Sequence, residues 1–318
     1  MKTWIGLTLL LLALPSVFSN KCKKEGSNLL IYGPTCNDLT TPREDDGATE
    51  EISLLHSFTL LGETHRSCFV NNNGVISFKG SVESYTPDGF PLPQYCMLSP
   101  YWGDVDNEDN PGTIYYRQTK DPEFLDCLSL EINKLYEGLE YKAAWAFVAT
   151  WHEVHYHGSE SNKTNTFQCV LVSDNHQRSI VLYLYDQITW TTGTASGGHP
   201  KTGLGGIPAQ AGINTPHQYF NMPMSRTEHI VNIASTSNVG CPGVWIFRAD
   251  KLMVPGGCLH KDSFLTRGQT VWMDDECANK CVCKHNGIVE CEDEGCDGDL
   301  VCLPAGRHYL CQINEVDC

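Results

Sequence analysis

The stretch KAAWAFVATWHEVHYHG, residues 142–158, decides the fold. Side chains of a β-strand alternate between its two faces, so Trp145, Phe147 and Trp151 share one face. Small or branched residues at the even positions 144–150 occupy the other face. Neither face carries a charge between residues 143 and 151, which is typical of a strand covered on both sides. The stretch therefore predicts a long central strand.

Further strand-like segments surround this one, and turn signals separate them. The sequence NNNG at 71–74 is typical of a hairpin turn, and DNHQR at 174–178 is turn-like. No convincing amphipathic helix longer than about ten residues stands out, although 124–138 has candidate apolar spacing. The fold class is therefore predicted to be mainly β, a β-sandwich-like domain followed by a small disulfide-rich module. The other predicted strands lie within residues 51–62, 67–80, 112–118, 166–174 and 179–190.

The cysteines divide the chain in two. All 16 follow residue 20, with seven between Cys22 and Cys241 and nine between Cys258 and Cys318. We expect residues 20–250 to form the β domain and residues 251–318 the cysteine-rich module. The odd counts leave three arrangements open: a disulfide between the modules, a free thiol in each, or pairing with another chain. The cysteines predicted to form disulfides are Cys22, Cys36, Cys68, Cys96, Cys127, Cys169, Cys241, Cys258, Cys277, Cys281, Cys283, Cys291, Cys296, Cys302, Cys311 and Cys318.

The first 19 residues predict secretion. Lys2 precedes an apolar run from Ile5 to Leu14, and small residues before Asn20 suit signal peptidase. The run is too short for a membrane span, and we expect no membrane insertion. Asn162 begins an Asn-Lys-Thr glycosylation sequence, which agrees with an extracellular surface.

The net charge of −16 excludes some partners. No basic stripe is available to neutralise phosphates, so nucleic acid is not an expected partner. Anionic membrane surfaces are disfavoured for the same reason.

The histidine-rich end of the first stretch has residue types that can bind a metal. A zinc peptidase helix needs two histidines four residues apart, whereas His152 and His155 are three apart in a strand-like segment. Strand alternation places Glu153, His155 and His157 on one side, and they remain a formal zinc alternative. The favoured interpretation is a solvated strand end, with no metal bound.

Two loops carry residues that could bind phosphate or calcium or supply a serine nucleophile. The glycine-rich residues 191–206 lack a phosphate-loop lysine in register, and Ser196 lacks the spacing of a nucleophile elbow. The acidic residues 101–112 contain Asp104 and Asp106, near which calcium is a minor expectation. Asp109 stands where an EF-hand needs glycine, so the competing interpretation is carboxylates that cap backbone amides.

Six sequence segments, taken together and in this order, resemble the nidogen-like NIDO domain. They are LSPYWGDVDNEDNPGTIYYRQ (98–118), KAAWAFVATWHEV (142–154), NTFQCVLVSD (165–174), LYDQITWTTGTASGG (184–198), GLGGIPAQAGIN (203–214) and SNVGCPGVWIFRAD (237–250). The resemblance runs from about Tyr32 to Asp250, and the wording is most similar to the N-terminal region of alpha-tectorin. Residues 257–296 resemble the von Willebrand factor C-like or TILa-type segment that follows there. The sequence at hand ends at Cys318, before the later modules of that protein, and filament formation is therefore not an expected property.

The resemblance implies a function without an active site. We expect a secreted, non-enzymatic extracellular-matrix or mucus-associated interaction protein, active in cell–matrix adhesion or matrix assembly. Its expected partners are matrix or mucin-type glycoproteins, with a covalent homo-oligomer as a further arrangement. One alternative is a secreted protease inhibitor that uses the cysteine-rich tail, with Arg267 or Arg307 in contact with the protease. A remote alternative is a zinc hydrolase built on Glu153, His155 and His157.

Overall fold

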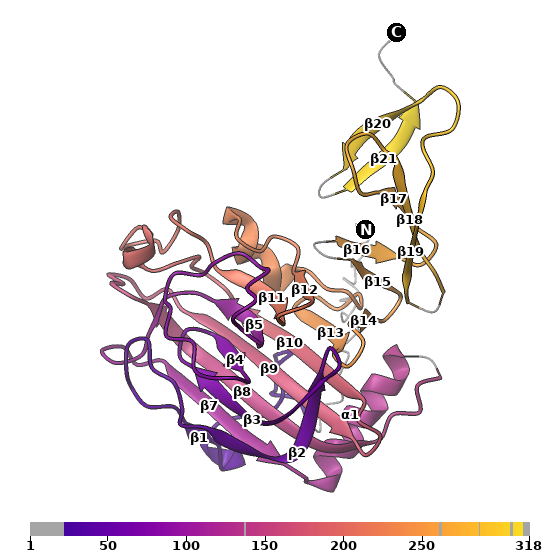
Figure 1. Cartoon of the computed structure of the whole chain (residues 1–318). Coiled ribbons are helices and arrows are strands. Elements are labelled where there is room, and N and C mark those ends of the chain that lie inside the picture. The colour runs from indigo at the N-terminus through magenta and orange to yellow at the C-terminus, as the bar shows by residue number, and fades with distance from the viewer. Residues whose placement is uncertain (1–21, 137, 261–262, 286, 306–307, 314–318) are drawn as a thin grey trace, which may run out of the picture.

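The computed structural model describes residues 22–136, 138–260, 263–285, 287–305 and 308–313. The predicted signal peptide, residues 1–19, lies outside these ranges. Within them the strands form three antiparallel sheets, which confirms the mainly β prediction. Two of these sheets pack face to face, and the third lies beyond them toward the C-terminal end (Figure 1).

The largest sheet is built around the stretch that decides the fold. That stretch forms β8 (Ala143–Tyr156), which lies between β7 (Thr113–Thr119) and β9 (Asn165–Asp174). Strands β9 and β10 form the predicted hairpin around residues 174–178. The rest of the sheet comprises β1 (Leu39–Thr40), β10 (Ser179–Gln187), β13 (Val244–Arg248), β14 (Met253–Val254), β15 (Gly257–His260) and β16 (Ser263–Thr266), with β6 (Val105–Asp106) paired to the end of β8.

The second sheet contains the hairpin predicted around NNNG. Strands β3 (Glu63–Asn71) and β4 (Val75–Ser77) flank that turn, as expected. The other strands are β2 (Ile52–Leu60), β5 (Met97–Trp102), β11 (Gln210–Asn214) and β12 (Tyr219–Asn221). Short 3-10 helices interrupt the loops at η1 (Pro34–Cys36), η2 (Thr194–Ser196) and η3 (Glu228–Ser235).

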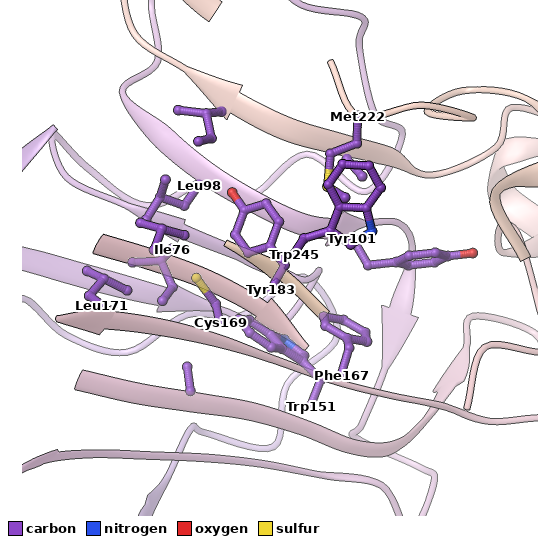
Figure 2. Packing of buried hydrophobic residues seen from close by; sticks show 14 of the residues in the cluster. Ile76, Leu98, Tyr101, Trp151, Phe167, Cys169, Leu171, Tyr183, Met222 and Trp245 are labelled. Carbon is purple, nitrogen blue, oxygen red and sulfur yellow. The ribbon is translucent and has the colours of Figure 1, made fainter. Parts of the chain in front are cut away.

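The core between these two sheets is aromatic. Trp151 stacks on Phe167 with ring centroids 5.0 Å apart, and Ile76 and Leu98 of the second sheet belong to the same buried cluster (Figure 2). Tyr183 crosses the interface and donates a hydrogen bond to the carbonyl of Gly212 at 2.7 Å, so its buried hydroxyl is satisfied. Each fully buried large side chain contributes about 1.5–3 kcal/mol. This core fixes the two sheets as a sandwich.

The outer face of the largest sheet is covered by a helix. Helix α1 (Pro122–Leu135) packs there, and Ala146 and Val148 of β8 belong to the same buried cluster as its Leu128. Burial of β8 on both faces is thereby confirmed. The expectation that no helix longer than about ten residues stands out was wrong, because the candidate apolar spacing at 124–138 does form a 14-residue helix. Asp121 caps it by accepting a hydrogen bond from Phe124 N at 2.8 Å.

The C-terminal sheet depends on disulfides. Its described core is small, and four disulfides join Cys258–Cys283, Cys277–Cys302, Cys281–Cys291 and Cys296–Cys311. A module this small buries too little apolar surface to be stable without such links. Its strands are β17 (Thr270–Trp272), β18 (Asn279–Cys283), β19 (Val289–Asp293), β20 (Leu300–Ala305) and β21 (His308–Ile313).

The junction at residue 250 is continuous in hydrogen bonding. Strand β14 pairs with β13, and β15 and β16 then extend the largest sheet beyond the expected boundary. The separate sheet begins only at Thr270. Cys258 of β15 is bonded to Cys283 of β18, so one disulfide joins the last strands of the largest sheet to the C-terminal sheet.

The β domain contains one described disulfide and several thiols. Cys22 bonds to Cys127 and ties the N-terminal lead to helix α1. In the described ranges no disulfide joins residues 20–250 to residues 251–318, and Cys318 lies outside those ranges. The remaining five described cysteines are thiols. Cys36 is partly buried, and the other four are buried: Cys68, Cys96, Cys169 and Cys241.

Candidate functional site

The histidine-rich end of β8 does not keep a regular alternation. A β-bulge lies between Trp151 and Val154, and Glu153 takes a positive φ of 50°. His152 turns toward Tyr32, with Nδ1 3.1 Å from the phenol oxygen, while His155 lies opposite Asp106 of β6. The bulge disrupts the alternation on which the zinc interpretation of Glu153, His155 and His157 depended. The described residues bring His157 together with other partners instead.

His157 meets two aspartates from distant parts of the sequence. Asp45 lies in the loop between β1 and β2, and Asp104 lies between β5 and β6. One ligand atom from each of the three residues lies within 4.8 Å of the others, and His157 Nδ1 is 3.0 Å from Asp45 Oδ2. We call this group the Asp45–Asp104–His157 cluster.

The asparagine turn at 71–74 holds the loops of this cluster in place. Buried Asn72 donates hydrogen bonds from Nδ2 to the carbonyls of Pro42 and Glu44 and to Asn107 Oδ1, at 2.7–3.1 Å. Next to it, Asn73 Nδ2 donates to Asp46 Oδ1, and Asn73 Oδ1 accepts from Val105 N. The turn therefore joins the loop that carries Asp45 to the loop that carries Asp104.

The glycine-rich loop, residues 191–206, also packs against the Asp45–Asp104–His157 cluster. Gly193 lies so close to Asp104 that a Cβ atom there would be 2.2 Å from Asp104 Oδ2. The neighbouring Thr192 is fully buried, and its hydroxyl has no hydrogen-bond partner within the described part of the chain. Thr194 N donates to the carbonyl of His157 at 3.0 Å. The sequence of this loop excludes a phosphate loop. It does not reveal the approach of Gly193 to Asp104, because that contact depends on tertiary packing.

Burial dominates the electrostatics of the cluster. Asp104 is 1% exposed, and this burial raises its pKa to about 7, against the opposing effect of His157. The pKa of Asp45 is also raised, again chiefly by burial. Among the described residues, neither Asp104 Oδ2 nor Asp45 Oδ1 has a hydrogen-bond partner. The side chains of Asp45 and His157 are 33% and 40% exposed, so the cluster is open to solvent on one side.

Asp104 and Asp106, near which calcium was a minor expectation, make different contacts. Asp106 Oδ1 accepts from Glu108 N at 2.9 Å, and its Oδ2 accepts from Asn110 Nδ2 at 3.0 Å. This agrees with the competing interpretation of a carboxylate that caps a turn. Asp104 instead faces Asp45 and His157.

An acidic hollow adjoins Asp45. It has a volume of about 390 Å³, and Glu44, Asp46, Glu50 and Glu83 line it together with Asp45. Five acidic side chains, Asp45 included, thus lie at or beside the cluster, where their charge would attract cations.

The other candidates for reactive chemistry are satisfied or inert. Cys96 Sγ lies 3.5 Å from His65 Nε2, but burial raises the pKa of the thiol to about 12 and lowers that of the imidazole. The pair therefore stays as a thiol and a neutral imidazole near neutral pH. Ser196 Oγ lies 2.7 Å from Thr86 Oγ1 rather than beside a histidine.

The remaining predicted residues lie at the surface or outside the description. Asn162 and Arg267 are exposed, whereas Arg307 lies outside the described residues. Glycosylation of Asn162 stays a prediction. Among the helices of the described ranges, none combines the length and hydropathy needed to cross a bilayer.

Comparison with known proteins agrees with this architecture. The family model of the nidogen-like domain (NIDO) matches residues 66–251. Alpha-tectorin from Mus musculus is 43% identical over 294 residues, which cover 90% of this chain and 14% of alpha-tectorin. Nidogen-1 from Mus musculus is 28% identical over 279 residues, which cover 82% of this chain and 22% of nidogen-1. Nidogen from Drosophila melanogaster is 28% identical over 208 residues, which cover 64% of this chain and 15% of that protein.

The chain thus spans about a seventh of the length of alpha-tectorin. No solved structure matches it. The family match covers more than half of the chain, and the similarity to alpha-tectorin extends through most of the rest. The chain therefore belongs to the nidogen-like (NIDO) domain family.

Proposed function

We propose that this protein is a secreted, non-enzymatic extracellular-matrix or mucus-associated interaction protein, with a role in cell–matrix adhesion or matrix assembly. The observation that carries the proposal is the 43% identity to alpha-tectorin across 90% of the chain. The alignment is too long to rest on the NIDO segment at 66–251 alone. The partners proposed are matrix or mucin-type glycoproteins.

The arrangement of the chain supports an interaction role. The sandwich is a rigid scaffold, and loops from both sheets meet at the Asp45–Asp104–His157 cluster beside the acidic hollow. Functional residues of β scaffolds are commonly carried on such loops. Residues 251–318 are proposed to be a von Willebrand factor C-like or TILa-type module that acts as a spacer or assembly segment.

Secretion is proposed from two features. Residues 1–19 have the pattern of a signal peptide, and ten cysteines are already paired in five disulfides. Disulfides persist in oxidising compartments, where an Asn162 glycan would also be attached. Both features support a function outside the cell.

A solid-phase binding assay tests the proposal. Secreted full-length protein is applied to immobilised basement-membrane and mucin glycoproteins, with serum albumin as the control surface. We expect saturable binding to at least one matrix preparation and none to albumin. Equal binding to all surfaces would overturn the proposal.

The inhibitor alternative is tested in parallel. Arg267 lies exposed in the turn after β16, close in sequence to the Cys258–Cys283 disulfide, so it could be presented rigidly. The secreted protein is titrated against trypsin-like proteases together with the Arg267→Ala variant. Stoichiometric inhibition that this variant loses would favour the alternative, and we expect no inhibition from either protein.

A further inference from the structure

We propose that Asp45, Asp104 and His157 form a binding site for a divalent cation of the zinc class. This inference is independent of the proposed matrix function. The three donors come from loops that follow β1, β5 and β8, and the fold alone brings them within 4.8 Å of one another. A cation bound there would cross-link three loops at one end of the sandwich.

Unpartnered buried atoms give independent support. Asp104 is 1% exposed, yet within the described residues its Oδ2 accepts no hydrogen bond. Asp45 Oδ1 is equally without a hydrogen-bond partner in that part of the chain, while His157 Nδ1 contacts Asp45 Oδ2. A buried polar atom left unsatisfied costs about 1–3 kcal/mol, and natural proteins rarely leave several together. A bound cation would satisfy both carboxylate oxygens at once.

An ordinary ion pair does not account for this arrangement. His157 Nδ1 and Asp45 Oδ2 are at ion-pair distance, 3.0 Å, but the contact leaves Asp45 Oδ1 and Asp104 Oδ2 unused. Two carboxylates beside each other also repel, and the other acids Asp46 and Asp106 raise the pKa of Asp104 further. A divalent cation would neutralise this accumulated negative charge.

The donor set indicates the class of cation. Calcium takes six to eight oxygen ligands, whereas zinc accepts imidazole nitrogen together with carboxylate oxygen. Ligand atoms about 2.1 Å from a tetrahedral or octahedral ion lie about 3.0–3.4 Å apart, and the 3.0 Å contact between His157 Nδ1 and Asp45 Oδ2 falls at this spacing. The expectation of calcium near Asp104 is thereby replaced by a site that shares Asp104 but binds a zinc-class ion.

The site is also accessible. The side chains of Asp45 and His157 are 33% and 40% exposed, so the site lies next to solvent, although the donor atoms themselves are buried. The adjoining acidic hollow concentrates cations at this entrance. His157 would coordinate through Nδ1, which requires that its proton be on Nε2.

Zinc titration of the untagged, secreted full-length protein tests the proposal. The protein is first stripped with a chelator and then titrated with zinc by calorimetry, with thermal unfolding followed in parallel. We expect one zinc ion per chain and a higher unfolding temperature when it is bound. The variants His157→Gln and Asp104→Asn should weaken zinc binding by about 100-fold or more.

The controls separate this site from unrelated zinc binding. His176 is exposed in the turn between β9 and β10, so His176→Gln should bind zinc like the unmodified protein. His157 is partly exposed, and His157→Gln should therefore remain folded by circular dichroism even if Asp104→Asn does not. Equal zinc affinity in His157→Gln and the unmodified protein would overturn the proposal. Calcium binding through these residues without zinc binding would overturn the zinc assignment.

Discussion

Gly193 approaches Asp104 so closely that a Cβ atom at position 193 would lie 2.2 Å from Asp104 Oδ2. Gly193→Ala should therefore displace either the carboxylate or the glycine-rich loop. We expect a loss of about 1–3 kcal/mol in the free energy of unfolding, together with weaker zinc binding. Urea denaturation and zinc calorimetry measure the two effects.

The matched control for Gly193→Ala is Gly295→Ala. The nearest atom to a Cβ at position 295 is 3.8 Å away, so that substitution changes the unfolded chain in the same way without a clash. If both variants lose the same stability and zinc affinity, close approach to Asp104 is not the reason for glycine at position 193.

Asn72→Ala should destabilise the loops around the cluster. The fully buried Asn72 amide donates to two carbonyls, of Pro42 and Glu44, which would be left without this donor. We expect a loss of about 1–3 kcal/mol in the free energy of unfolding. Asn232→Ala, at an exposed position in η3, should change it by less than about 0.5 kcal/mol. A similar loss in both variants would contradict the bridging role of Asn72.

The contribution of His65 to the stability of the protein should fall in mildly acidic solution, whereas Asp104, whose pKa is raised, acts in the opposite direction. Burial lowers the pKa of His65 below its ordinary value of 6.5, so the unfolded chain binds protons that the folded chain excludes. The contribution of His65 is therefore full above about pH 6.5 and is lost as the pH falls below it. Urea unfolding between about pH 7 and pH 5 measures this dependence.

Charged neighbours shift the pKa of His65 in both directions, but the net shift remains downward. Glu63 raises the pKa of His65 and Lys79 lowers it, while burial is the largest effect. Glu63 itself has a lowered pKa, because of Lys79, and therefore titrates below this window. As the pH falls from about 7 to 5, the His65→Gln variant should lose less stability than His176→Gln, because Asp104 contributes equally in both. Identical slopes in the two variants would refute the assignment.

Buried thiols should resist alkylation in the folded protein. Cys68, Cys96 and Cys169 are buried, and burial raises the pKa of all three, so thiolate is scarce. Iodoacetamide should label none of them in native conditions and all of them after denaturation without reductant. Peptide mass spectrometry measures both states. A disulfide between any two of these cysteines after denaturation would contradict the pairing described above.

The sequence predicts the β architecture well because alternation is a local signal. Burial of β8 on both faces followed from Trp145, Phe147 and the small residues between them, and the hairpin at NNNG followed from its turn residues. The bulge at Glu153 was not predictable, since it depends on pairing with two neighbouring segments, β6 and β9.

The cluster was predictable only in pieces. His157 and Asp104 were both singled out, but in separate motifs and not together with Asp45. Asp45 lies in a charged loop that resembles any solvated turn, and only the contacts of Asn72 and Asn73 bring that loop to Asp104. Such contacts between distant segments leave no spacing pattern in the sequence.

The Cys258–Cys283 disulfide has a mechanical consequence. Tension applied to the C-terminal sheet would pass through this covalent bond into β15, and from there into the strands paired beside it. A peptide linker of a few residues would instead bend like a hinge and leave the two parts to move separately. The disulfide would therefore couple a pull on the C-terminal sheet to the hydrogen-bonded strands of the largest sheet.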